Sequence, residues 1–210
     1  LCPTRRSSGL ADGQFEFQDG KLTMNIAPST VNSVLHSLTF DEGGAWRLIG
    51  PDFTSSPSTA SSVTATMLFN DLRITSLDGI PLSSPIIVAP TFSSSASPQT
   101  GTAHVNQTSG NIVISSAGND AAGTWDINAA FNLDAALTGA GKTGRITSIS
   151  VALDNQLLAQ TSDLANLTLA SIDKKHLFVS GATTILDVPE PASLSVLLLG
   201  GLMFRRRRAA

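Results

Sequence analysis

The chain has 210 residues, of which 41% are hydrophobic and only 14% are charged. This composition supports a folded core, because disordered chains combine low hydrophobicity with high net charge. The formal net charge of -3 disfavours nucleic-acid binding, which requires a basic face. The single cysteine, Cys2, excludes a disulfide framework and a cysteine-based zinc site.

The charges are unevenly distributed along the chain. Residues 11–187 contain 15 acidic and 7 basic side chains, whereas residues 188–210 contain four arginines and one glutamate. The 27 serines and 21 threonines give the body a neutral, hydroxyl-rich surface. The length fits one domain with appendages. We expect an extracellular domain over residues 11–187 and a sorting segment over residues 188–210.

The first ten residues contain two adjacent arginines, Arg5 and Arg6. The run Pro3-Thr4-Arg5-Arg6-Ser7-Ser8 is followed by no apolar stretch of the kind found in export signals. It resembles translated adapter sequence. We therefore expect residues 1–10 to be a non-native stretch outside the folded domain, and a native export signal to have been lost upstream of it.

The body is predicted to be made of short strands. Apolar residues alternate with polar ones over residues 62–69, 125–133 and 148–153, the pattern of strands with one buried face. Asp19-Gly20 predicts the turn of a hairpin that begins at Gln14 and ends at Ile26. Further turns are expected at Gly43-Gly44, Asp78-Gly79 and Ser109-Gly110. Segments 54–62 and 92–101 are predicted loops, and residues 135–144 a loop or short helical turn.

Many short strands without helix-period segments between them indicate an all-β protein. We predict an antiparallel β-sandwich, jelly-roll-like, with a short hydrophobic helix at its C-terminal end.

Candidate catalytic and metal-binding residues are few. His36, His104 and His176 are too widely spaced to predict a zinc site. Although serine is abundant, the chain has no Gly-x-Ser-x-Gly motif. We therefore expect no catalytic residue, no resident metal and no enzyme activity.

Two weaker possibilities stay open. Glycoside cleavage needs a pair of carboxylates, which could come from Asp126, Asp134 or Asp154. Calcium is the remaining metal alternative, through oxygen donors in Asp41-Glu42-Gly43-Gly44 and Asp154-Asn155. Trp46 and Trp125 are the only tryptophans available for a sugar-binding platform. The alternative to a structural protein is thus a carbohydrate-binding or hydrolytic β-sandwich.

The C-terminal segment has three parts in a fixed order. Val188, Pro189, Glu190 and Pro191 come first, and the two prolines favour an extended chain that a peptidase can bind. A mainly apolar stretch follows from Ala192 to Phe204, in which the membrane-facing candidates are Ala192, Leu194, Val196, Leu197, Leu198, Leu199, Leu202, Met203 and Phe204. The chain then carries Arg205, Arg206, Arg207 and Arg208.

As a helix, this stretch would span roughly 20 Å of a hydrocarbon core about 30 Å thick, which makes it a marginal membrane anchor. The arginines would stay on the cytoplasmic side and leave the body outside.

This arrangement resembles the PEP-CTERM sorting signal of exported bacterial proteins, whose processing enzyme is an exosortase. The resemblance implies that residues 189–191 are the recognition tripeptide, residues 192–204 the membrane stretch and residues 205–208 the stop-transfer cluster. Residues 153–162 and 172–175 are loosely similar to the last strands of β-rich PEP-CTERM domains, which implies fold only. The family further implies transient anchoring in the inner membrane, then the cell surface or an extracellular biofilm matrix, with exopolysaccharide as a partner.

Overall fold

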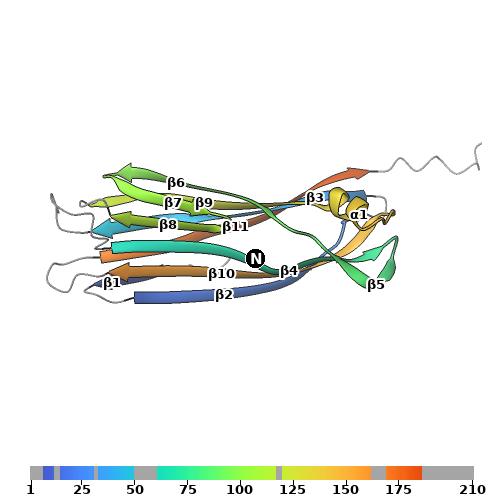
Figure 1. The fold of residues 1–210 in the computed structure, drawn as a ribbon, viewed down its shortest axis with the longest axis horizontal. Coiled ribbons are helices and arrows are strands. Elements are labelled where there is room, and N and C mark those ends of the chain that lie inside the picture. The colour runs from blue at the N-terminus through green and yellow to red at the C-terminus, as the bar shows by residue number, and fades with distance from the viewer. Residues whose placement is uncertain are drawn as a thin grey trace, which may run out of the picture.

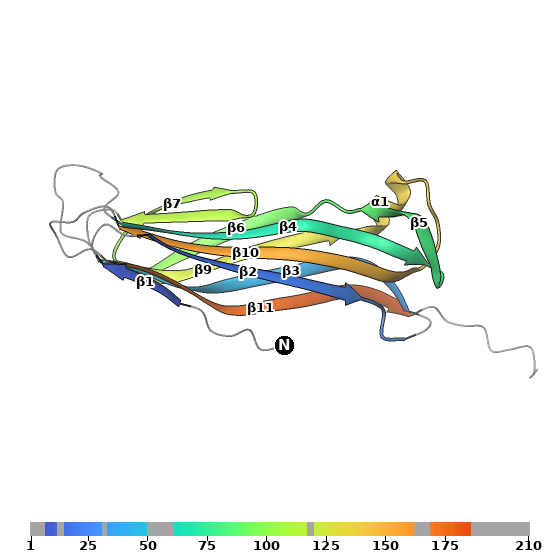
Figure 2. The same ribbon diagram turned by 90° about the horizontal axis from the view of Figure 1, so that it is seen from below.

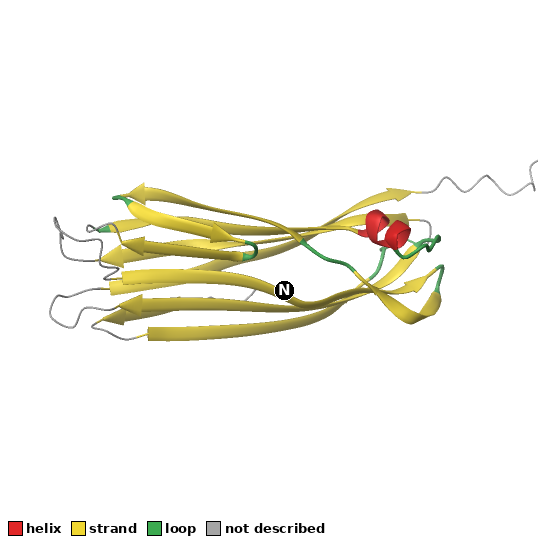
Figure 3. Cartoon of the chain, in the orientation of Figure 1, coloured by secondary structure: helices red, strands yellow, loops and turns green. Residues whose placement is uncertain are grey.

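The computed structural model describes residues 7–11, 15–30, 33–49, 61–116, 120–161 and 169–185. In this part of the chain, eleven strands run along the long axis of an elongated molecule, and one short helix lies near one end (Figures 1 and 3). The elements are β1 (Ser7–Ala11), β2 (Phe15–Ile26), β3 (Ser33–Ile49), β4 (Ser61–Leu77), β5 (Ile80–Ile87), β6 (Thr91–Thr100), β7 (Ala103–Thr108), β8 (Asn111–Ser116), β9 (Ala121–Asn132), α1 (Leu133–Gly139), β10 (Ile146–Thr161) and β11 (Leu169–Ile185).

The strands form two antiparallel sheets (Figure 2). Sheet A has the order β1-β11-β3-β9-β6, and sheet B has the order β2-β10-β4-β8-β7, with β5 paired to β4. The pairing is mirrored along the chain, because β1 pairs with β11, β2 with β10, β3 with β9 and β4 with β8. A long two-stranded ribbon folded over itself in this way is a jelly roll. The predicted all-β, jelly-roll-like sandwich is confirmed.

The core lies between the sheets and follows the predicted alternation. Along β9, the side chains of Trp125, Ile127, Ala129 and Phe131 are buried, and along β10 the same holds for Ile149, Val151 and Leu153. Val63, Ala65 and Met67 are buried on β4. Their period of two places one face of each strand against the facing sheet.

Three local predictions were wrong. Asp19-Gly20 is not a turn, because β2 runs straight through it and pairs with β10 along its whole length. Gly43-Gly44 lies in the middle of β3. The predicted loop over residues 92–101 is largely β6, which pairs with β9. In each case a long partner strand supplies backbone hydrogen bonds that outweigh the local turn preference.

Other local predictions were correct. Asp78 and Gly79 both have positive φ, at 50° and 80°, as a two-residue hairpin between β4 and β5 requires. Ser109-Gly110 turns the chain from β7 into β8. Part of residues 135–144 is helical, and the side chain of Asn132 caps α1 by accepting a hydrogen bond from the amide of Ala135 at 2.9 Å.

The N-terminal boundary of the domain differs from the expected one. Ser7–Ala11 form the edge strand β1 of sheet A and pair with β11, so residues 7–10 belong to the sandwich, although residues 1–10 were expected to lie outside it. The expected hydrophobic helix over residues 192–204 lies outside the described residues. Within the described ranges, no helix has the length and apolar character needed to cross a membrane.

The centre of sheet A contains a β-bulge on which the local geometry depends. Lys174 pairs with Gly44 and His176 pairs with Gly43, so Lys175 is an extra residue in β11. The bulge turns the carbonyl of Asp173 over Gly44, where a Cβ would collide with it. Two hydrogen bonds hold this arrangement: the indole of Trp125 donates to the Asp173 carbonyl at 3.1 Å, and the amide of Ala45 donates to the Asp173 carboxylate at 2.8 Å.

Substituting Gly44 with alanine should therefore destabilise the protein. The added methyl group has to displace the Asp173 backbone, and such overpacking costs on the order of 2 kcal/mol or more. Gly20→Ala is the matched control, because a Cβ there meets only the carbonyl oxygen of Asn155 at an ordinary 3.7 Å. Chemical denaturation should show a large loss for Gly44→Ala and a change below about 1 kcal/mol for Gly20→Ala. Equal effects at both positions would contradict the role given to the bulge.

Candidate functional site

The carboxylates proposed for glycoside cleavage do not form one site. Asp126 lies on β9, Asp134 at the start of α1 and Asp154 on β10 of the other sheet. Each has a different neighbour: Asp126 lies 3.8 Å from His176, Asp134 lies 2.8 Å from His36, and Asp154 interacts with Asp19. The geometry therefore does not assemble the pair of facing carboxylates that this chemistry needs.

Both tryptophans are interior residues. Trp46 and Trp125 are 2% and 0% exposed, and their indole N–H groups donate to the backbone carbonyls of Thr124 and Asp173. Neither ring is available as a stacking surface for a sugar. Their role is to fill the core and to satisfy backbone acceptors of neighbouring strands in sheet A.

The segments considered for calcium are strands and not loops. Asp41 and Glu42 are successive residues of β3, so their side chains point to opposite faces of sheet A. Asp154 and Asn155 are successive residues of β10. Neighbouring oxygen donors in a strand diverge, and the expected loop-type donor sets do not form.

A different set of side chains meets on the outer face of sheet A. Asp41 from β3, Asp126 from β9 and His176 from β11 form what we call the central cluster. The Nε2 atom of His176 lies 3.1 Å from an oxygen of Asp41 and 3.8 Å from an oxygen of Asp126. One ligand atom from each residue falls within 4.8 Å of the other two. Three strands that are distant in sequence thus place one imidazole and two carboxylates together.

The register explains why these residues meet. His176 is opposite Gly43, which is opposite Asp126 on the next strand. In the adjacent row, Phe178 is opposite Asp41. The extra residue at Lys175 switches the face to which β11 side chains point, so His176 is directed outward whereas Lys174 is directed inward.

Gly43 provides the space beneath the central cluster. A Cβ at this position would collide with the Asp126 carboxylate and would lie 2.6 Å from Cε1 of His176. Any other residue at position 43 would therefore push the two side chains apart. A shallow hollow of about 120 Å³ adjoins Asp126 and is lined by Ser93, Ser94, Ser95 and Asn128.

The ring of His176 is also supported from one side. It stacks on Phe178, with ring centroids 5.0 Å apart and planes inclined by 24°. Phe178 is itself 64% exposed, so the stacked pair lies on the outer surface of the sheet. This stacking limits the orientations that His176 can adopt.

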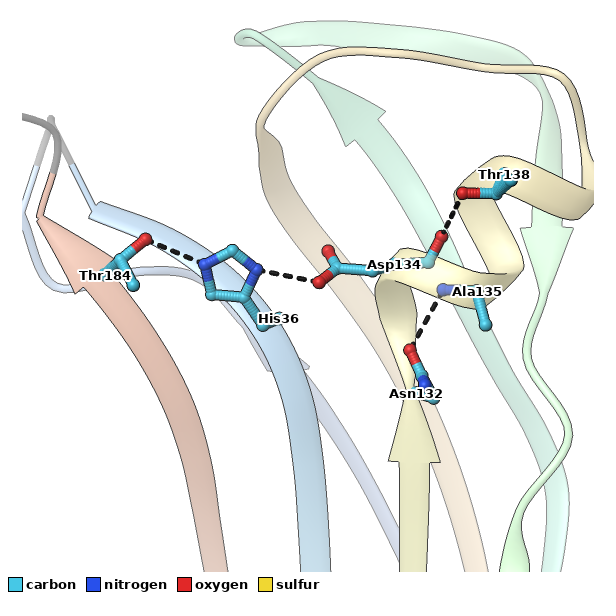
Figure 4. A network of polar contacts seen from close by, with 6 residues as sticks. All are labelled: His36, Asn132, Asp134, Ala135, Thr138 and Thr184. Atoms are coloured by element: carbon cyan, nitrogen blue, oxygen red, sulfur yellow. Dashed lines mark hydrogen bonds and ion pairs between the residues drawn. The ribbon is translucent and has the colours of Figure 1, made fainter.

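A second polar network lies at the end of the sandwich that carries α1 (Figure 4). The two ring nitrogens of His36 lie 2.8 Å from the Asp134 carboxylate and 2.7 Å from the Thr184 hydroxyl. His36 therefore joins β3 to β11 and to the first turn of α1 (Figure 4). With one carboxylate in place of two, this network serves as an internal comparison for the central cluster.

Directly beneath the central cluster, sheet A contains a buried ion pair. Glu42 is fully buried, and its carboxylate lies 3.1 Å from the ammonium group of Lys174. Burial raises the pKa of Glu42 from 4.5 to about 7, because desolvation outweighs the opposing effects of Lys174, His176 and Asn155. Ionisation of Glu42 in the core therefore costs free energy.

This pKa predicts a pH-dependent stability. The folded protein keeps a proton on Glu42 between about pH 4.5 and 7, whereas the unfolded chain releases it. The free energy of unfolding should therefore fall as the pH rises through this window, by up to about 3 kcal/mol from this one group. Glu42→Gln keeps the shape and should remove this slope.

Urea denaturation at pH 5 and at pH 8 measures the effect. Glu16→Gln, on the edge strand β2, is the matched control and should retain the wild-type slope. If Glu42→Gln and wild type lose the same stability between the two pH values, burial does not control the ionisation of Glu42.

The sequence indicates the members of the central cluster but not their association. It suggests Asp41 as a calcium ligand, Asp126 as a carboxylate for glycoside cleavage and His176 as an isolated histidine. The alternation that buries Trp125 does place Asp126 on the outer face. No pattern in the sequence marks the bulge at Lys175, which brings His176 to the same face. The predicted sorting residues 188–191, 192–204 and 205–208 lie outside the described residues.

Comparison with known proteins gives little further information. No protein-family model matches the sequence, and no curated protein matches it. Two solved structures of infectious bursal disease virus, from the Gt and Gx strains, are 11% identical to this chain with TM-scores of 0.10 and 0.11. They align with 100% and 94% of this chain, which spans about half of theirs, at 52% and 48%. Similarity this low supports no argument about fold or function.

Proposed function

We propose that this protein is an exported, non-enzymatic β-sandwich of the bacterial cell surface or extracellular matrix, sorted and processed at its C-terminus by an exosortase-type enzyme. The observation that carries the proposal is the order of elements in residues 188–208: the Pro-Glu-Pro tripeptide, the apolar stretch and the four arginines. Each part has the physical property that this processing requires, namely an extended recognition segment, a membrane-inserting segment and a cytoplasmic stop.

The architecture is compatible with removal of this tail. The last strand of sheet A, β11, ends at Ile185, before the first residue of the sorting motif. Every strand that the structure describes, together with α1, lies within residues 7–185. Cleavage near residues 189–191 therefore takes no strand from either sheet, and the released domain keeps its core.

The surface also suits a structural or matrix role. The outer face of sheet A is rich in hydroxyl and amide groups along β6 and β9, and it forms shallow hollows. Such a face offers many hydrogen bonds to hydrated polysaccharide without a deep pocket. We accordingly propose exopolysaccharide as the associated polymer, with the processing enzyme and the inner membrane as transient partners.

A carbohydrate-binding or hydrolytic domain is the second candidate. The hollow that adjoins Asp126 favours it, because serine hydroxyls, an amide and a carboxylate converge there. The buried tryptophans and the separated carboxylates count against an aromatic platform and against glycoside cleavage. Release of reducing ends from a host polysaccharide by the purified domain would favour this candidate over the structural one.

The C-terminal mass of the protein recovered from an exosortase-containing host tests the sorting proposal. We expect loss of residues beyond the Pro-Glu-Pro region, and an unprocessed chain when Glu190 is replaced by alanine. Pro85→Ala, at an exposed position of β5, is the control and should be processed normally. An intact arginine run on the mature surface protein would refute the proposal.

The membrane stretch can be tested separately. Replacing Leu197, Leu198 and Leu199 with aspartate should abolish membrane retention of the precursor, because charges at the centre of a spanning helix each cost about 3 kcal/mol. Membrane fractionation of cells that lack the processing enzyme provides the measurement. An unchanged membrane fraction would contradict the assignment of residues 192–204 as an anchor.

A further inference from the structure

We propose that the central cluster is a binding site for a divalent transition-metal ion, with zinc as the ion that best matches its donors. Asp41, Asp126 and His176 would each supply one ligand atom, Oδ1 from each aspartate and Nε2 from the histidine. This proposal is independent of the sorting signal and concerns the folded body alone.

The spacing of the donors is close to that of a coordination sphere. Two ligands bound at about 2.1 Å to a tetrahedral ion lie roughly 3.4 Å apart. Nε2 of His176 lies 3.1 Å from Asp41 and 3.8 Å from Asp126, and all three donor atoms are within 4.8 Å of one another. Binding therefore needs only small rotations of the two carboxylates toward a common centre.

The donor set selects the class of ion. Imidazole nitrogen combined with carboxylate oxygen suits zinc and neighbouring transition metals, whereas calcium and magnesium prefer oxygen alone. Three protein ligands leave a coordination position open to solvent. His176, Asp41 and Asp126 have 29%, 43% and 53% of their side chains exposed, so an ion has a direct path to the site.

The backbone of β3 and β11 leaves room for the site and directs its side chains. Gly43 lies below the cluster, and the space that a side chain would occupy there is filled by the Asp126 carboxylate and the His176 ring. The bulge at Lys175 and the stacked ring of Phe178 direct the imidazole to this position. Three features of three adjacent strands thus converge on one point of the sheet.

Electrostatics further favour a cation. Within the described residues, no lysine or arginine forms an ion pair with Asp41 or Asp126. The two carboxylates lie close to each other, with only the imidazole of His176 between them. A divalent ion would relieve this repulsion and would link β11, β3 and β9 across the centre of sheet A.

Calorimetric titration of the purified full chain with zinc chloride tests the proposal. We expect one saturable site per chain. His176→Ala and Asp126→Asn should each weaken binding at least tenfold, and Asp126→Asn changes no volume, so it remains informative if His176→Ala folds poorly. His36→Ala is the matched control, because His36 contacts a single carboxylate, and it should bind zinc like the wild type.

Two further measurements separate a coordinated ion from loose surface binding. Bound Co²⁺ should give visible absorption bands characteristic of low coordination number in the wild type and in His36→Ala, but not in His176→Ala. Zinc should raise the melting temperature of the wild type and leave that of Asp126→Asn unchanged. Absence of saturable zinc binding, equal weakening by His36→Ala, or equally tight binding of calcium would each overturn the proposal and leave His176 as an ion-pair partner of the two aspartates.

Discussion

The hydrogen bond from the Trp125 indole to the carbonyl of Asp173 is the contact on which the centre of sheet A depends. A bulge interrupts the regular ladder of hydrogen bonds, and a buried acceptor without a donor is costly. Trp125 provides the donor from the neighbouring strand β9, and Gly44 leaves the room that the carbonyl needs. The largest core side chain thus also satisfies the irregular backbone of β11.

The same bulge determines what lies on each side of the sheet. Before it, Lys174 points inward and pairs with Glu42, and after it, His176 points outward between Asp41 and Asp126. One extra residue therefore places a cation in the core and an imidazole on the surface within two positions of each other. The buried pair and the central cluster are consequences of a single irregularity, and His176 contributes to the field that acts on Glu42.

How much of this could be predicted depends on the range of the interactions. Period-two alternation identified the buried faces of β4, β9 and β10 correctly, because burial acts on each residue independently of its strand partner. Turn propensity failed at Asp19-Gly20 and at Gly43-Gly44, where a long partner strand overrides a local preference. The central cluster could not be predicted, since it depends on the registers of three strands and on one bulge, none of which has a local signature.

The way in which the fold pairs its carboxylates supports a binding role for the central cluster. The body has 15 acidic side chains in 177 residues, which would allow the carboxylates to lie far apart. The fold instead brings Asp41 near Asp126, and Asp19 near Asp154. In the second pair, a hydrogen bond to Asp19, burial and the charge of Asp19 all raise the pKa of Asp154. The first pair has an imidazole between its carboxylates, which makes it the pair equipped to bind a metal ion.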